Sequence, residues 1–467
     1  MITESTFKRS HTRRSVSKPR VLANIGLGVL GTVILAAYSS FARPIWLDEF
    51  LHFALGAIPS DEILSVIYES TGPNVNHGQT GIYMYFDYWL LQLFGANLFW
   101  LRFPSLVAAA IMLASAVYFL RVKGFGYFWQ YLVLLAFGAQ STLMYFTGEA
   151  RPYIWLASTA IATLAYYQTP LSRRNRLPVM LLGGYGVLFG AIAHPYYVVF
   201  FVLIAAFSLW TQLYVGRNRL NLRGYITFLN PYLVIPGAAL FLVIGSLTWL
   251  RGNPAFDRSA WDLLGPIGAL REGINGHFGM FVWTREIPPN YIVLFFVASL
   301  SVLLLFRLAS WSREATASFV LIGLGIGTTV SVSVISAISS YWILSRQWVG
   351  GMAMTTLGVV WLLAIIFRSA DLNGVRSIKL IAVGLSAYIV FVGTLQIWGS
   401  VNQIASWMNT QNEILTRDGI ALNIEIAELK INSLESDLDL VDAANLNIIQ
   451  GNEVWPGFAA YYEGYRR

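Results

Sequence analysis

Two adjacent acids, Asp48 and Glu49, are the residues of this chain best suited to chemistry. They lie in the segment RPIWLDEFLHFALG at 43–56, directly after the first long apolar run. A membrane protein has few places where a carboxylate stays ionised, and a sheltered aqueous pocket at the end of a span is one of them. The pair therefore predicts a catalytic or binding site just outside the membrane. The alternative is that one of the two acids begins a helix, where negative charge is favoured.

Arg151 and Arg346 are the cations that such a site would use. Arg151 lies in GEARPYIWL at 148–156, between two apolar runs, and Arg346 lies in SRQW at 345–348. A guanidinium beside apolar sequence needs a bound anion or a carboxylate partner, and its planar fork suits phosphate. For Arg151 the alternative is a structural pair with Glu149. For Arg346 it is an anchor at the membrane surface among neighbouring aromatic residues.

Further side chains could line the same pocket. His77 in NHGQTG and His194 in AHPYY are imidazoles that could hold a phosphate, although a solvated or buried structural histidine is the alternative. Tyr153, in GEARPYIWL, could line the cavity beside them. Arg43 and Arg102 flank the first loop, either as phosphate contacts or as anchors at the membrane edge.

The need for a cofactor stays open. The two adjacent acids and His77 could supply hard ligands for a divalent metal, but no compact ligand spacing is visible in the sequence. The chain has no cysteine, which excludes disulfides, thiolate nucleophiles and thiolate metal sites.

The composition is that of an integral membrane protein. Hydrophobic residues make up 56% of the chain, charged residues only 12%, and the mean hydropathy is +0.58. Many Trp and Tyr residues stand at the ends of apolar runs, where amphipathic rings prefer the headgroup layer. The sequence pI of 9.4 could suggest nucleic acid as a partner. Most basic residues lie in short loops beside apolar runs, however, which indicates membrane orientation and not a polynucleotide surface.

The apolar runs predict an all-α chain with about 11 membrane spans. We place the spans at 21–40, 99–120, 125–146, 153–170, 177–194, 196–215, 225–249, 290–308, 316–339, 349–368 and 378–398. The pattern GLGIG at 323–327 is typical of glycines at a helix–helix contact in a membrane.

The distribution of charge predicts the orientation of these spans. The basic arm at 1–20 is expected in the cytoplasm, because the loops that would share its side hold most of the Lys and Arg residues. The opposite side then receives a first outer loop at 41–98, with helices in the interface plane, and a second at 250–289. The segment 399–467 is expected to be a small tail on that outer side. A transmembrane domain at 21–398 lies between the arm and the tail.

The chain resembles the polytopic glycosyltransferases of the GT-C fold, in the branch related to protein O-mannosyltransferases and lipid A aminoarabinose transferases. The resemblance covers residues 20–370 and rests on motifs in the family's order. These are WLDEF at 46–50, NHGQTGIYMYFDYWLLQLFGANLFWLRFPS at 76–105, GEARPYIWL at 148–156, AHPYY at 193–197 and SRQW at 345–348. Where relatives often carry a His or Lys followed by prolines, this chain has HGQTG after Asn76, so it departs from the family there.

The resemblance implies an enzyme that moves a sugar from a polyprenyl-phosphate carrier to an acceptor at the outer face of the cytoplasmic membrane, with inversion at the anomeric carbon. Asp48 matches the first-loop acid of the family and is expected to take the proton of the acceptor hydroxyl. Glu49 would orient the acceptor, set the environment of Asp48 or share an ion. Arg151, Arg346 and His77 would stabilise the departing phosphate. The absence of a Gly-rich phosphate loop agrees with a lipid-linked donor.

Other functions remain open at this stage. A transporter or lipid flippase would place charged groups at mid-membrane, whereas here they cluster towards one face. A non-catalytic subunit of an envelope polysaccharide machine would have the fold without needing Asp48. The acceptor could be an envelope glycan, a glycolipid or a protein, and fold resemblance does not decide between them.

Overall fold

All regular secondary structure in the described part of the chain is helical. The computed structural model describes residues 26–32, 34, 49, 52, 59–68, 80–95, 98–215, 222–248, 273–274, 276–281, 312–339, 348–373, 380, 382–395 and 398. No strand occurs among these residues. The predicted span at 290–308 and the tail at 399–467 lie outside them.

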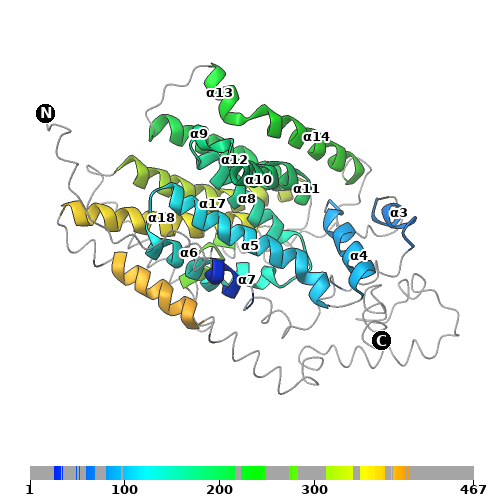
Figure 1. The fold of residues 1–467 in the computed structure, drawn as a ribbon, viewed down its shortest axis with the longest axis horizontal. Coiled ribbons are helices and arrows are strands. Elements are labelled where there is room, and N and C mark those ends of the chain that lie inside the picture. The colour runs from blue at the N-terminus through cyan, green and yellow to red at the C-terminus, as the bar shows by residue number, and fades with distance from the viewer. Residues whose placement is uncertain are drawn as a thin grey trace.

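Four helices are long and apolar enough to cross a membrane. They are α5 (Leu98–Val122), α12 (Tyr197–Tyr214), α17 (Arg313–Ser339) and α18 (Val349–Asn373). Each coincides with a span expected from the sequence. The protein is therefore an all-α membrane protein, and α17 and α18 lie side by side along it (Figure 1).

Helix α8 (Tyr153–Gln168) occupies the centre of the bundle, and every one of its residues is buried. It packs against α5, α12 and α18 (Figure 1). Its sequence YIWLASTAIATLAYYQ is rich in Ala, Ser and Thr, whose small side chains let neighbouring helices approach closely. A helix without a polar face must be enclosed by protein or lipid, and α8 is enclosed by protein.

Several of the expected spans are interrupted. The run at 125–146 is divided at Gln140 into α6 (Tyr127–Ala139) and α7 (Ser141–Thr147). The run at 225–249 is divided at Asn230, whose φ of 55° is left-handed, into α13 (Leu222–Leu229) and α14 (Pro231–Thr248). Apolar composition predicted the extent of these runs but not their breaks.

The run at 177–194 contains a π-helical turn between two short helices. Helix α10 (Leu177–Gly183) leads into η2 (Gly184–Phe189), and α11 (Gly190–Ala193) follows. The π-turn lies against α8 so closely that a Cβ on Gly186 would stand 2.7 Å from the backbone nitrogen of Thr163. Single π-turns inside α-helices often occur at functional sites.

Two helices of the first predicted outer loop lie together at the end of the bundle where α5 begins. They are α3 (Ile63–Tyr68) and α4 (Ile82–Phe94), and α4 packs against both α3 and α5 (Figure 1). Helices were expected in this loop. Near them in the sequence, Glu49 and His52 are helical as well.

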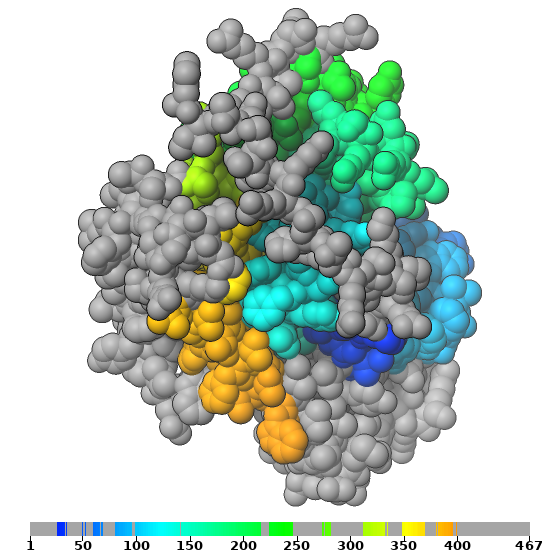
Figure 2. Space-filling model, turned by 60° about the vertical axis from the view of Figure 1, so that its left-hand side comes forward, coloured from blue at the N-terminus to red at the C-terminus, as the bar shows by residue number. Residues whose placement is uncertain are grey.

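The last described helix, 382–395, covers α6. A Cβ on Gly393 would stand 3.1 Å from the carbonyl oxygen of Leu135, and the hydroxyl of Tyr388 donates a hydrogen bond to the carbonyl oxygen of Phe281 at 2.8 Å. Residues 26–32 also contact α6, since Gly28 faces Leu134. Figure 2 shows this orange helix and the blue N-terminal residues on the surface, on either side of cyan residues from the first third of the chain.

Candidate functional site

Glu49 is fixed in the interior by three hydrogen bonds. The guanidinium of Arg102, in the first turns of α5, donates from Nε to Oε1 at 2.9 Å and from Nη2 to Oε2 at 2.6 Å. The backbone nitrogen of Ala150 donates to Oε1 at 2.7 Å. Glu49 is 0% exposed and Arg102 is 1% exposed. The two-pronged contact is the geometry in which a planar guanidinium binds a carboxylate most specifically.

A second buried pair, which the sequence analysis did not identify, joins His52 to Asp87 on α4. The imidazole Nδ1 and the carboxylate Oδ2 are 2.6 Å apart, and both side chains are fully buried. Asp87 stands in the apolar helix sequence IYMYFDYWLLQLF. An ionisable residue in such a helix is a signal that could have identified it.

Tyr83 and Ser105 connect α4 to α5 and to the turn before α8. The hydroxyl of Tyr83 lies 2.7 Å from Ser105 Oγ, which itself donates to the carbonyl oxygen of Glu149 at 2.6 Å. The ring of Tyr83 also meets the ring of His52 edge-on, with centroids 5.6 Å apart. The segments that carry the two buried pairs are thus held together.

Arg151 and Glu149 bring a third segment to the same place. Both are 2% exposed, in the turn GEAR that leads into α8. Arg151 and Glu49 are both within electrostatic reach of Asp87, and Glu149 is within reach of Tyr83. The residues Glu49, His52, Asp87, Arg102, Glu149 and Arg151 therefore form one buried group, which we call the charged cluster.

The environment of Asp87 opposes its ionisation. Burial raises the pKa of its carboxyl well above the ordinary value, the negative charge of Glu49 raises it further, and Arg151 lowers it. Burial in a low dielectric disfavours the charged form of any acid. Asp87 therefore holds a proton more readily than an exposed aspartate would.

Tyr153 and His194 lie next to the charged cluster. Their rings are 5.8 Å apart, and His194 is buried, with Nδ1 accepting a hydrogen bond from the backbone nitrogen of Tyr196 at 3.2 Å. The hydroxyl of Thr80 donates to the carbonyl oxygen of Ala193 at 3.4 Å, which ties this turn to the residues before α4. The structure thus brings together Glu49, Arg102 and Arg151 of the predicted site residues, with Tyr153 and His194 beside them.

The remaining predicted residues, Asp48, His77, Arg43 and Arg346, lie outside the described residues. Asp48 is covalently adjacent to Glu49. Within the part of the chain that the structure describes, no three His, Asp or Glu side chains are placed to hold a metal ion.

Comparison of this chain with protein-family models, with curated proteins and with solved structures gives no match.

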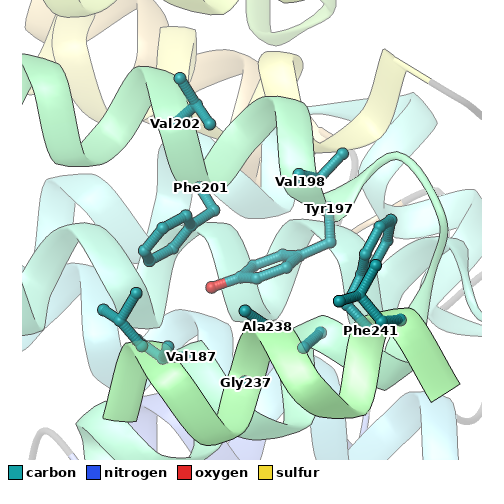
Figure 3. A pocket seen from close by; sticks show the side chains of 11 residues that line it. Val187, Tyr197, Val198, Phe201, Val202, Gly237, Ala238 and Phe241 are labelled. Carbon is teal, nitrogen blue, oxygen red and sulfur yellow. The ribbon is translucent and has the colours of Figure 1, made fainter. Parts of the chain in front are cut away.

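An apolar cavity of about 320 Å³ lies between α12, the π-turn and α14. Tyr197, Phe201, Val187 and Gly237 are among the residues that line it (Figure 3). The hydroxyl of Tyr197 is hydrogen-bonded to Thr163 Oγ1 at 2.7 Å. The cavity therefore offers carbon surface to a ligand and almost no polar group.

His277, from the second predicted outer loop, is a structural histidine. Its Nδ1 lies 2.9 Å from Thr355 Oγ1 on α18, and its Nε2 is hydrogen-bonded to Thr329 Oγ1 on α17. The Nε2 of Gln140 donates to its carbonyl oxygen at 3.3 Å. His277 thus joins the two long helices to the break between α6 and α7.

Proposed function

We propose that this protein is an inverting glycosyltransferase of the GT-C type, which moves a sugar from a polyprenyl-phosphate carrier to an acceptor hydroxyl. The observation that carries the proposal is the meeting of three sequence segments in the charged cluster. WLDEFLHF contributes Glu49 and His52, the helix with FDYW contributes Asp87, and GEARPY contributes Glu149 and Arg151. Glu49 and Ala150, which are hydrogen-bonded, are 101 residues apart in sequence.

The reaction needs a base and an anion site close together. Asp48 takes the proton of the acceptor hydroxyl while that oxygen attacks the anomeric carbon of the sugar. The bond from this carbon to the phosphate oxygen breaks, and the electron pair leaves with the lipid phosphate. Arg151, with Arg346 and His77, stabilises the charge that develops there.

Glu49 has a positioning role in this mechanism. Both of its carboxylate oxygens accept hydrogen bonds, from Arg102 and from the Ala150 backbone. A carboxylate whose two oxygens already accept hydrogen bonds is a poor base. It also has little capacity left to bind the hydroxyl of the acceptor substrate. Glu49 fixes the backbone next to Asp48 against α5 and the turn before α8.

The surroundings suit a lipid-linked donor. The cluster lies at the ends of apolar helices, and the apolar cavity between α12 and α14 begins within a few residues of His194. A charged headgroup and a hydrocarbon chain would therefore find matching surfaces close together. We further propose about 11 spans in the cytoplasmic membrane, with the N-terminus in the cytoplasm and the cluster on the outer side.

A second candidate is a non-catalytic membrane subunit of an envelope glycan assembly. The observation that favours it is the mutual pairing within the cluster, where Glu49 binds Arg102 and Asp87 binds His52. Paired buried charges also occur as purely structural devices. This candidate predicts that the cluster binds no phosphate.

Binding of undecaprenyl phosphate to the purified full-length protein, measured by native mass spectrometry, tests the proposal. Arg151→Ala is expected to weaken binding about tenfold or more, because a charge-assisted contact to phosphate is worth roughly 1.5–3 kcal/mol. Arg173→Ala is the matched control, since Arg173 is exposed beyond the other end of α8. Equal affinity of wild type, Arg151→Ala and Arg173→Ala would overturn the donor site.

A further inference from the structure

The charged cluster has an unbalanced charge among its described members. Glu49, Asp87 and Glu149 are acids, Arg102 and Arg151 are permanent cations, and none of them is more than 2% exposed. One negative charge is therefore in excess when His52 is neutral. Burial makes a net charge unfavourable, and one proton on the His52–Asp87 pair would balance these described members. Asp48 and Arg346, which the proposed function adds, carry opposite charges, and with a neutral His77 they leave this balance unchanged.

His52 and Asp87 are placed to hold that proton. Their Nδ1 and Oδ2 atoms are 2.6 Å apart, which requires a proton between them, and charge-assisted hydrogen bonds are shorter than neutral ones. The groups that face the pair are Tyr83 on its own helix, Glu49 beside His52, and Arg151 in the turn before α8. Arg102 on α5 is hydrogen-bonded to Glu49, and Glu149, in the same turn as Arg151, accepts a hydrogen bond from Ser105 at its carbonyl oxygen. The pair is the neutralising member of the group.

We propose that the His52–Asp87 pair holds one exchangeable proton that keeps the charged cluster neutral, and that this proton controls the affinity of the site for a phosphate headgroup. The second part rests on the proposed function, and the first does not. When the proton leaves, the cluster gains a negative charge a few side chains from Arg151. A lipid phosphate is then repelled.

The environment of Asp87 agrees with a retained proton. Burial and the charge of Glu49 raise the pKa of this carboxyl well above its ordinary range, against the opposing effect of Arg151. In the unfolded chain the aspartate loses its proton near pH 4 and the histidine near pH 6.5, about the ordinary pKa values of these side chains. Above about pH 6.5 the folded pair therefore binds one proton more than the unfolded chain does.

The Tm of the wild-type protein and the Tm of Asp87→Asn should respond to pH in opposite directions. The first should fall as pH rises above about 6.5, and the second should fall as pH drops below it. In the wild type, the extra proton of the folded state is lost as pH rises through the folded pKa, so the contribution of the pair to Tm falls above about pH 6.5. In Asp87→Asn the cluster is neutral with a neutral His52. The variant is then insensitive to pH above about 6.5 and loses stability below it, where the unfolded histidine takes up a proton.

His52→Gln is a second variant that keeps the test informative if Asp87→Asn does not fold. Asp87 is then the only member of the pair that can hold the proton. The pKa that matters in the unfolded chain is therefore that of an aspartate. The loss of stability begins above about pH 4 in this variant, against about pH 6.5 in the wild type. Asp61→Asn is the matched control, because Asp61 is exposed in the loop before α3 and should leave the wild-type profile unchanged.

The binding of undecaprenyl phosphate across the same pH range tests the second part. Wild-type affinity is expected to fall about tenfold per pH unit above the pKa of the pair, as for any ligand that requires one bound proton. Asp87→Asn is expected to bind with an affinity that does not change with pH above about 6.5.

Parallel Tm profiles of wild type, Asp87→Asn and Asp61→Asn would overturn the shared proton. Distinct Tm profiles with binding that is independent of pH would leave the proton in place but overturn its control of the site. Absence of binding at every pH, in wild type and in Arg151→Ala alike, would count against the proposed function alone, since the Tm profiles need no ligand.

Discussion

At the scale of single residues, we propose different roles for the two acids of the DE pair. The two carboxylate oxygens of Glu49 accept hydrogen bonds from Arg102 and from the backbone nitrogen of Ala150. The ion pair is fully buried, so each partner keeps the other from being an isolated charge. We infer that the Glu49–Arg102 ion pair holds the backbone of the site in place, and that Asp48 is the base of the reaction.

Removing one partner of this pair should be costly, and removing both should not. Glu49→Leu or Arg102→Met alone leaves one buried charge without its partner and is expected to lower stability by about 3–5 kcal/mol. The double variant Glu49→Leu with Arg102→Met, an apolar pair of similar volume, is expected to recover most of that loss. Denaturant unfolding of the purified protein in detergent, analysed as a double-mutant cycle, measures both. Additive losses in the double variant would contradict the buried pair.

The sequence identified some members of the cluster and could not identify others. Glu49, Arg102 and Arg151 were recognised because charged residues beside apolar runs are rare and need a partner. Which partner each one takes could not be predicted, since the hydrogen bonds of Glu49 reach residues 53 and 101 positions away. Asp87 was missed although it stands in an apolar helix sequence, and its pairing with His52, 35 positions away, could not be predicted.

At the scale of elements, the apolar runs predicted where helices lie but not where they break or how closely they pack. The glycines of GLGIG show the difference. A Cβ on Gly325 would stand 2.3 Å from Thr355 Oγ1 and 2.7 Å from the carbonyl oxygen of Gly351, so α17 and α18 touch here through their backbones. Gly323 and Gly327 meet no described atom within 4 Å. Only the central glycine is therefore the packing residue that the pattern predicted.

Substitution of these glycines should separate packing from helix propensity. Gly325→Ala is expected to lower stability by about 1–3 kcal/mol, because the added methyl group forces the two backbones apart. Gly323→Ala has free space and is expected to be neutral or stabilising by up to about 1 kcal/mol, since alanine favours the helix. Thermal unfolding of the two variants in the same detergent compares them. Equal effects would show that α17 and α18 do not meet at Gly325.

At the scale of the whole molecule, charged groups of the described bundle stand at both ends of α5. Arg102 and the charged cluster stand where α5 begins, and Lys123 stands just past its end, about 30 Å away at 1.5 Å per residue. At that second end Lys123 Nζ donates to Gln168 Oε1 at 2.7 Å, and Gln168 Nε2 donates to Ser208 Oγ at 3.0 Å. The span of α5 thus connects one polar layer to another, as a membrane-crossing helix requires.

The absence of native cysteine allows a direct test of which layer faces the cytoplasm. Asp61→Cys near the charged cluster and Arg173→Cys beyond the other end of α8 each introduce one exposed thiol. A membrane-impermeant maleimide is expected to label Asp61→Cys in intact cells, and Arg173→Cys only after permeabilisation, because the basic loops stay inside. Labelling of Arg173→Cys alone in intact cells would reverse the orientation and place the cluster in the cytoplasm.

The most direct test of the account is the transfer reaction itself. A deletion strain is complemented with wild type, Asp48→Asn or Asp61→Asn at matched expression, and its polyprenyl-phosphate sugars and envelope glycans are profiled by mass spectrometry. We predict that Asp48→Asn matches the deletion strain, with one lipid-linked sugar accumulated and one glycan modification lost, while Asp61→Asn matches wild type. A wild-type profile in Asp48→Asn cells would contradict the proposed base and favour the non-catalytic subunit.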